Sequence, residues 1–401
     1  MKKINLVCFL CFCLYNVNGQ NSNDIVIGKI DSINSNTLNE QRKIWIHIPE
    51  SSSKVEDKKK KYPVIYLLDG GTNFHSVVGM IQQLSSVNTI VPKMIVVGIP
   101  NTNRTRDLTP TKVDKVANSG GGENFISFIE KELIPYIDSN YPTDPYRMFI
   151  GHSLGGLTVM NTLIEKPELF NSYVAIDPWM SWDNKKLLNE IKLNTFDKKY
   201  NNKKLYLGIA NTMSEGMDIL NVQKDTTYQT ENIRSVLELN DVLKKGTQKQ
   251  LSFKSKYYGE DDHYSLALIT EYDALRFIFD FYQLKLYNKD YLNPKSDIYN
   301  KIVNHYKLLS KEFRKEMIPD EKYINGFGSY FMSVQQFRKA EDFFKLNVTN
   351  YPDSFKGYGS LGDLYVEIGD KEMAIENYKK SISLNSESEI SKKKLKELEK
   401  E

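Results

Sequence analysis

The chain has 401 residues, which at about 150 residues per domain predicts two or three domains and excludes a single small module. Hydrophobic residues make up 40% of it, aromatic residues 12% and charged residues 26%, as in water-soluble globular proteins and unlike disordered, collagenous or multi-span membrane chains. The formal charge of +3, from 54 basic and 51 acidic residues, gives no electrostatic reason to expect nucleic acid or an anionic membrane as a partner.

The N-terminal residues 1–19 have the pattern of a secretory signal peptide, with Lys2 and Lys3 before an apolar stretch that runs to Val17. This stretch is shorter than the roughly 20 residues of a membrane span, so we expect cleavage rather than an anchor. The mature protein would then begin at Gln20 and be exported to the periplasm or the medium, with no membrane span. It would also have no thiol, because all three cysteines lie in the removed segment.

Short segments of β type come first after residue 20. The runs 25–33 and 42–48 flank a polar turn and predict an antiparallel pair of strands. Five apolar runs with the length of buried strands follow, and then a sixth strand candidate. These six segments are 64–68, 94–98, 147–150, 173–176, 205–210 and 251–257.

Segments of helical period lie between these strands, and the clearest is 123–139, with apolar residues at three- and four-residue spacing. The others are 157–165, 233–245 and 265–282. Strands that alternate with helices form βαβ units. The pattern therefore predicts an α/β fold over residues 20–285, a three-layer sandwich with a mostly parallel sheet, followed by a polar linker at 286–297.

The remaining residues, 298–401, have helical period and an internal repeat at an offset of 34 residues. Two sets of residues superimpose at that offset: Ile324, Phe327, Gly328, Phe331, Ala340 and Phe344 on Tyr358, Leu361, Gly362, Tyr365, Ala374 and Tyr378. This pattern resembles the tetratricopeptide repeat. We expect 298–315 and 391–401 to cap the two repeats, and their concave surface to bind a protein partner. The alternative is a plain helical hairpin with accidental periodicity.

The pentapeptide Gly151-His152-Ser153-Leu154-Gly155 follows a predicted strand and precedes a predicted helix. In that context the G-x-S-x-G pattern predicts a nucleophile elbow, where small residues on either side of the serine let strand and helix pass closely. Ser153 is therefore the candidate nucleophile. The oxyanion needs two backbone N–H donors, for which we expect Leu154 and Gly71. The alternative for Gly71 is an ordinary Gly-Gly turn.

A serine nucleophile needs a histidine as its base and a carboxylate that orients the histidine. His263 lies after the last strand and before the last helix of the α/β domain, where an α/β-hydrolase carries its base. The acid is expected after the strand 205–210, with Glu215 as first choice and Asp218 as second. Either carboxylate would alternatively cap the following helix, and the two aspartates just before His263 are further alternatives.

These residues belong to longer motifs that resemble the bacterial Putative esterase family of the α/β-hydrolase fold. That family includes enterochelin-type siderophore esterases, S-formylglutathione hydrolases, feruloyl esterases and mycolyltransferases. The resemblance covers most of residues 25–285. It rests on Tyr-Leu-Leu-Asp-Gly at 66–70, Val-Val-Gly-Ile at 96–99, Arg-Thr-Arg-Asp-Leu-Thr-Pro at 104–110, Gly-His-Ser-Leu-Gly-Gly at 151–156 and Asp-Ala-Leu-Arg-Phe-Ile at 273–278.

The resemblance also has implications for single positions. In the mycolyltransferases the acid is a glutamate a few residues past a strand and an Asn-Gly-Thr turn, and the similar stretch 211–215 favours Glu215. The residue after the family's Leu-Leu-Asp-Gly motif completes the oxyanion hole, and it corresponds to Gly71. Some siderophore esterases of the family lack a well-placed acid.

Four further residues are expected to bind substrate: His75, Arg104, Arg106 and Trp179. The two arginines follow the strand 94–98 at the edge where such sheets bind ligands, and the alternative is an ion pair that braces the loop. Trp179 follows another strand at this edge, where it would form either an aromatic wall or part of the core. Zinc-like ligand spacing and a dinucleotide fingerprint are absent from the sequence, so we expect no metal and no cofactor.

Together these patterns predict an exported serine hydrolase that cleaves carboxylic esters through an acyl-enzyme intermediate on Ser153. The substrate would be a small-molecule or polysaccharide-linked ester, such as a siderophore, a cell-wall ester or an envelope ester. One alternative is an acyltransferase with the same triad. The other is a catalytically idle hydrolase fold that serves as a binding scaffold through its repeats.

Overall fold

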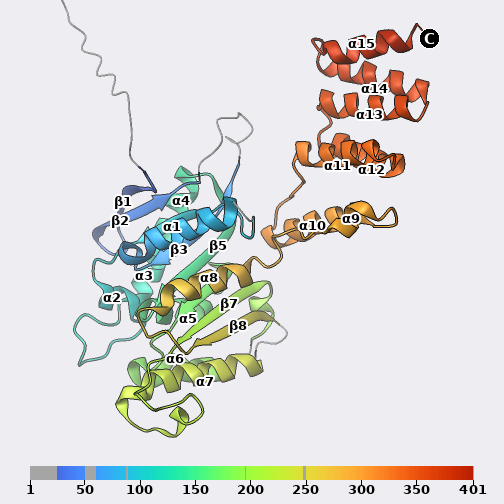
Figure 1. Cartoon of the computed structure of the whole chain (residues 1–401). Coiled ribbons are helices and arrows are strands. Elements are labelled where there is room, and N and C mark those ends of the chain that lie inside the picture. The colour runs from blue at the N-terminus through green and yellow to red at the C-terminus, as the bar shows by residue number, and fades with distance from the viewer. Residues whose placement is uncertain (1–24, 50–59, 87–88, 195, 247–249, 401) are drawn as a thin grey trace, which may run out of the picture.

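The computed structural model describes residues 25–49, 60–86, 89–194, 196–246 and 250–400. The expected signal peptide at 1–19 lies outside these residues. An α/β domain comes first in the described chain, and a helical module follows it (Figure 1).

One eight-stranded sheet forms the centre of the α/β domain, with the strand order β1-β2-β4-β3-β5-β6-β7-β8. The first two neighbour pairs in that order are antiparallel and the others are parallel. The strands are β1 (Lys29–Ser35), β2 (Glu40–His47), β3 (Tyr62–Leu68), β4 (Ile95–Ile99), β5 (Thr143–His152), β6 (Ser172–Ile176), β7 (Lys203–Ala210) and β8 (Leu251–Tyr258). The predicted antiparallel pair and mostly parallel sheet are confirmed.

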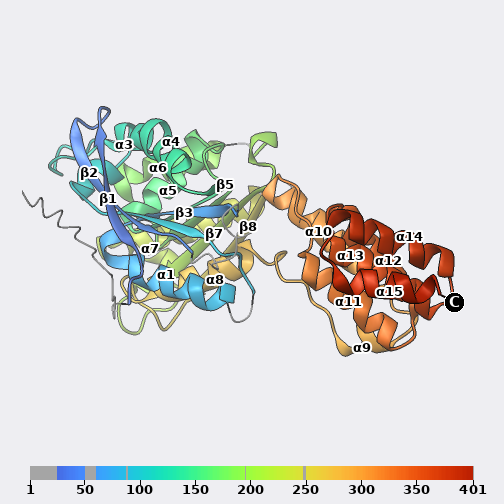
Figure 2. The same ribbon diagram turned by 90° about the horizontal axis from the view of Figure 1, so that it is seen from above.

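Helices cover both faces of this sheet, which is why every residue of β3, β4 and β6 is buried. Helices α1 (Gly70–Ser86) and α8 (Leu266–Ile278) pack on one face. The other face is covered by α3 (Gly122–Phe128), α4 (Ile134–Asn140), α5 (Leu154–Glu165), α6 (Trp182–Leu193) and α7 (Glu231–Gly246). Figure 2 shows α1 and α8 on the opposite side of the sheet from α3, α4 and α5. The short helix α2 (Arg104–Leu108) follows β4.

The helix predicted over 123–139 is interrupted in the structure. A π-helical turn, Ile129–Leu133, separates α3 from α4. Pro135 lies at the start of α4 and has no N–H to donate to the carbonyl one turn earlier. The wider π turn accommodates this missing hydrogen bond, so the apolar period continues through the interruption.

The helical module contains the two predicted repeats. Its helices are α9 (Asn288–Leu292), α10 (Ile298–Phe313), α11 (Glu321–Ser333), α12 (Phe337–Asn350), α13 (Phe355–Glu367), α14 (Lys371–Leu384) and α15 (Glu389–Leu398). A Cβ atom on Gly328 would lie 2.4 Å from the ring of Phe344, and one on Gly362 would lie 2.5 Å from the ring of Tyr378. The two glycines are therefore required where each repeat's first helix meets its second.

Helix α10 contacts both parts of the protein. Its first half contributes Ile298 and Ile302 to the core of the helical module, whereas Leu309 and Phe313 belong to the core of the α/β domain. Lys315, two residues beyond the end of α10, pairs with the buried Asp144. The expected boundary at residue 298 therefore falls before a helix that both parts share, and the expected linker contains α9.

This attachment fixes the helical module at one end of the sheet. The ring of Phe313 lies 5.5 Å from that of Tyr146, near the start of β5. Tyr146 lies six residues before His152, the last residue of β5, and six residues at 3.3 Å each span about 20 Å. The module is therefore attached toward the amino ends of the parallel strands, about 20 Å from their carboxyl ends. Figure 1 shows its helices stacked away from the sheet.

Candidate active site

Ser153 lies in a sharp turn between β5 and α5. Its backbone has φ 60° and ψ −116°, a conformation that residues with a side chain rarely adopt. A Cβ atom on Gly151 would lie 2.4 Å from the carbonyl oxygen of Gly155, so strand and helix cross here without room for a side chain. This is the geometry of a nucleophile elbow.

His263 is hydrogen-bonded to a carboxylate, that of Asp177. The His263 Nδ1 atom lies 2.6 Å from Asp177 Oδ2, and the other oxygen of Asp177 accepts the N–H of Ala210 at 3.3 Å. Asp177 is fully buried and follows β6 directly. An ionised carboxylate only accepts hydrogen bonds, so Nδ1 carries the proton and Nε2 of a neutral His263 presents a lone pair.

The sheet register brings the serine and this pair to one edge. His152 of β5 is paired with Ile176 of β6, so Ser153 and Asp177 are the next residues beyond two adjacent strands. The Ser153 N–H donates to the Ile176 carbonyl at 2.9 Å. The rings of His152 and His263 are 4.5 Å apart. Ser153, His263 and Asp177 therefore gather at the carboxyl ends of the parallel strands.

The expected acids, Glu215 and Asp218, lie in the exposed loop after β7. Asp218 accepts hydrogen bonds from Asn221 and from nearby backbone N–H groups, and the Asn221 side chain is the main cause of a lowered Asp218 pKa. The two aspartates before His263 hold the backbone and Ser265 of their own loop. The carboxylate that contacts His263 thus follows β6, one strand earlier than the sequence analysis placed it.

The expected oxyanion donors begin two helices at the same edge. Leu154 is the first residue of α5, and Gly71 is the second residue of α1, where backbone N–H groups have no acceptor within the helix. Strands β3 and β5, which precede these helices, are adjacent in the sheet. A Cβ atom on Gly71 would meet nothing within 4 Å, so this turn is open to a ligand.

Both arginines expected to bind substrate make ion pairs. Arg104 donates to both oxygens of Asp69, at 2.7 and 2.9 Å, and to the His152 carbonyl at 3.1 Å. Arg106 binds two carboxylates, those of Glu40 and Asp107, and its hydrogen bond is the main cause of a lowered Glu40 pKa. These contacts correspond to the alternative of arginines that brace the loop.

Aromatic side chains flank the candidate catalytic residues. The Trp179 side chain is 38% exposed, and the backbone N–H of this residue donates to the Ser153 carbonyl at 3.1 Å. Tyr264, which the sequence analysis did not select, is 82% exposed with its ring 5.3 Å from that of His263. His75 is exposed on α1 beside Trp45. Trp179 and Tyr264 thus offer aromatic surface next to the candidate nucleophile Ser153 and the candidate base His263.

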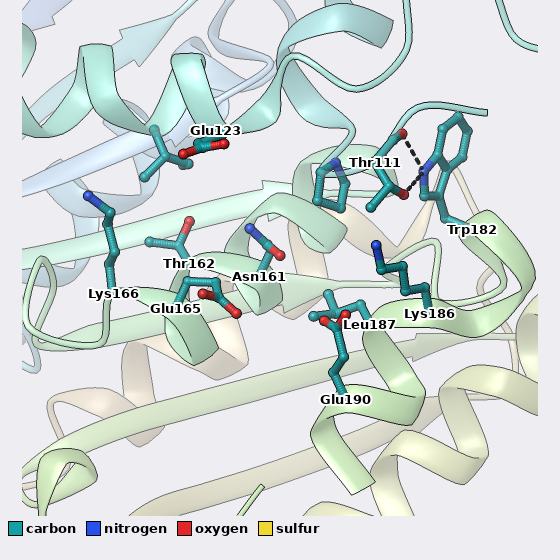
Figure 3. Close-up of a pocket in the computed structure, with 12 residues that line it drawn as sticks. Thr111, Glu123, Asn161, Thr162, Glu165, Lys166, Trp182, Lys186, Leu187 and Glu190 are labelled. Carbon is teal, nitrogen blue, oxygen red and sulfur yellow. Dashed lines mark hydrogen bonds between the residues drawn. The ribbon is translucent and has the colours of Figure 1, made fainter. Parts of the chain in front are cut away.

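A separate hollow of about 350 Å³ lies on the outer side of α5, between α3 and α6 (Figure 3). The carboxylates of Glu123, Glu165 and Glu190 line it, and a hydrogen bond from Trp182 to Thr111 closes one end. None of the three catalytic candidates is part of its lining, so the hollow is separate from the candidate active site.

Among the described residues, no helix is both long enough and apolar enough to span a membrane. Within the same residues, no group of three or more His, Cys, Asp and Glu side chains is arranged to hold a metal ion.

Two family models match the sequence. The model described as Putative esterase matches residues 35–266, and that of the tetratricopeptide repeat matches residues 355–388. Ferri-bacillibactin esterase BesA of Bacillus subtilis is 29% identical over 280 residues, which cover 65% of this chain and 93% of that protein. The siderophore triacetylfusarinine C esterase of Aspergillus fumigatus is 24% identical over 220 residues, which cover 50% of this chain and 75% of that protein.

Solved structures show the same architecture. The IroE-like serine hydrolase from Shewanella oneidensis superimposes with a TM-score of 0.60 at 30% identity, over 80% of this chain and 98% of that one. An uncharacterised protein from Capnocytophaga ochracea gives a TM-score of 0.68 at 20% identity, over 93% of this chain and 100% of that one. The second likeness shows that the fold of both parts occurs together in another protein.

Proposed function

We propose that this chain, which belongs to the Putative esterase family, hydrolyses siderophore esters. In this proposal Ser153 is the nucleophile, His263 the base and Asp177 the acid. The protein is an ester hydrolase by this membership and by its esterase relatives. The proposal concerns the residues that act and the substrate. The observation that carries it is the His263–Asp177 hydrogen bond beside the nucleophile elbow.

The geometry supports a double-displacement mechanism. Nε2 of His263 takes the proton of the Ser153 hydroxyl as its oxygen attacks the ester carbonyl carbon, and Asp177 stabilises the imidazolium that forms. The N–H groups of Leu154 and Gly71 donate to the oxyanion. The imidazolium then gives its proton to the leaving alcohol, and a water molecule, deprotonated by His263, releases the acyl group from Ser153.

Two observations support a siderophore as the substrate. Two relatives are named as esterases of siderophores. The exposed faces of Trp179 and Tyr264 next to the catalytic residues suit a ligand that carries planar aromatic groups. A cell-wall ester or an envelope ester is the alternative substrate to be tested beside it.

The helical module would serve a partner without covering the active site. It is attached at the amino ends of the strands through α10, whereas the catalytic residues lie at the carboxyl ends. A protein bound by the module would therefore leave the catalytic edge open to the substrate. Export remains part of the proposal on the pattern of residues 1–19.

Hydrolysis assays test this proposal. The substrates are a catecholate trilactone siderophore with and without ferric iron, an acetylated cell-wall polysaccharide and p-nitrophenyl acetate. We expect the siderophore to give the highest kcat/KM, and Ser153→Ala to lower it by several orders of magnitude. Ser214→Ala, in the exposed loop after β7, is the matched control. Equal hydrolysis by Ser153→Ala would contradict the mechanism, and a preference for the polysaccharide would contradict the substrate class.

A further inference from the structure

The side chain of His152, the residue before the nucleophile, is bonded to the loop that carries the base. Its Nε2 lies 2.7 Å from the backbone carbonyl oxygen of His263. A carbonyl oxygen only accepts, so Nε2 of His152 carries a proton and donates it. The two imidazole rings also touch, with their centroids 4.5 Å apart and their planes inclined at 42°.

The backbone of His152 is held from the opposite side. Its carbonyl accepts the 3.1 Å hydrogen bond from Arg104, whose guanidinium also binds Asp69. Asp69 immediately precedes α1, which carries the amide of Gly71. Residue 152 therefore connects three segments of the site: the turn before α1, the nucleophile elbow and the loop of His263.

We propose that His152 is a positioning residue for ester hydrolysis, which holds the His263 loop at the elbow through its Nε2–H hydrogen bond. This inference rests on the proposed function, since it takes His263 as the base. The loop lies between β8 and α8 and is exposed on both sides of His263. A displacement of about 1 Å between reacting groups lowers the rate by up to about 100-fold, so a side-chain bond to the residue that carries the imidazole has a direct consequence for kcat.

The charges around His152 fit this role. Four ionisable residues face it: His263, Asp177, Asp69 and Arg104. Burial is the main cause of a lowered His152 pKa, and the nearby His263 is the second cause. His152 is therefore neutral at neutral pH. A neutral neighbour does not repel the imidazolium that forms on His263 during catalysis.

Two substitutions at this position test the inference. His152→Phe keeps the ring contact with His263 and removes the donor, whereas His152→Gln keeps an N–H donor near the same place. With p-nitrophenyl acetate we expect kcat of His152→Phe to fall about tenfold, the worth of one hydrogen bond, with KM unchanged. His152→Gln should recover most of kcat.

The outcomes separate this inference from the proposed function. Two results would refute the positioning role: a kcat of His152→Phe equal to that of the wild type, or a kcat of His152→Gln as low as that of His152→Phe. If Ser153→Ala is inactive in the same assay, the mechanism stands in either case. Activity in Ser153→Ala would refute the mechanism itself. If His152→Phe is misfolded by circular dichroism, the comparison of His152→Gln with His152→Leu decides, and equal kcat in these two variants would refute the inference.

Discussion

The most informative single change is Asp177→Asn. In the wild type one carboxylate oxygen of Asp177 accepts from His263 Nδ1 at 2.6 Å and the other accepts the Ala210 N–H at 3.3 Å. Asparagine has nearly the same shape, and its oxygen can still accept from Ala210. Its NH2 group then faces Nδ1 and donates to it. The proton of a neutral His263 must move to Nε2, which can no longer accept the proton of Ser153.

The expected loss is large and specific to chemistry. The wrong tautomer lowers kcat of a serine hydrolase by about 10⁴-fold, or about 5.5 kcal/mol at 1.36 kcal/mol per tenfold. The assay is hydrolysis of p-nitrophenyl acetate, with thermal unfolding to show that the fold persists. Glu215→Gln is the matched control, because Glu215 is exposed in the loop after β7, and its kcat should stay within about twofold of the wild type. A large loss in Glu215→Gln with activity kept in Asp177→Asn would refute the reasoning.

Three further predictions concern stability. Gly151→Ala places a Cβ atom 2.4 Å from a backbone carbonyl oxygen and should lower the free energy of unfolding by about 3 kcal/mol. The control Gly79→Ala lies in open space on α1 and should raise the free energy of unfolding by up to about 1 kcal/mol. Chemical denaturation measures both changes. A chain that ends after residue 319 keeps α10, and its melting temperature should be near that of the wild type. A chain that ends after residue 285 loses two buried side chains of α10 from the α/β core, and it should melt at a lower temperature or precipitate. Burial raises the pKa of Glu271 from 4.5 to about 8. Between these two pH values the folded state therefore binds one proton more than the unfolded state. The free energy of unfolding should then fall as pH rises, by up to about 1.4 kcal/mol per pH unit. Melting curves of Glu271→Gln from pH 5 to 9 should lack this slope, and an unchanged slope would show that other groups cause it.

The sequence predicts the parts of the site that depend on local pattern. The nucleophile elbow needs two glycines at fixed spacing because strand and helix cross there, and the contact of Gly151 with Gly155 lies within five residues. The repeats are predictable for the same reason, since Gly328 and Gly362 make room for rings on the next helix. Such short-range steric demands leave a direct mark on the sequence.

The candidate acid Asp177 was not predicted from the sequence, because its place depends on which strand end lies beside His263. The usual order of the fold puts the acid after the strand that corresponds to β7, where it was expected. A usable signal follows the buried strand β6, because Asp177 comes directly after the end of a parallel strand that is adjacent to the elbow strand β5. The sequence shows where each strand ends, but the side chain that turns toward His263 depends on the loops beyond β6 and β7.

Helix α1 was missed as well, because its first residues obscure its amphipathic pattern. Helix α1 begins with Gly70-Gly71-Thr72-Asn73, residues typical of turns, so the sequence analysis considered only the oxyanion loop there. Helix α10 was expected to belong to the helical module, because its apolar face has one period throughout. The structure divides that face between two cores, and this division depends on tertiary contacts.

Labelling with a fluorophosphonate tests the central claim most directly, because such reagents react with a serine that a neighbouring base has activated. The full protein would be treated beside Ser153→Ala and Asp177→Asn, digested, and mapped by mass spectrometry. We predict one phosphonyl group on Ser153 in the wild type, slow labelling in Asp177→Asn and none in Ser153→Ala. An adduct on another serine, or equal labelling of all three proteins, would contradict the assignment of Ser153 as the nucleophile.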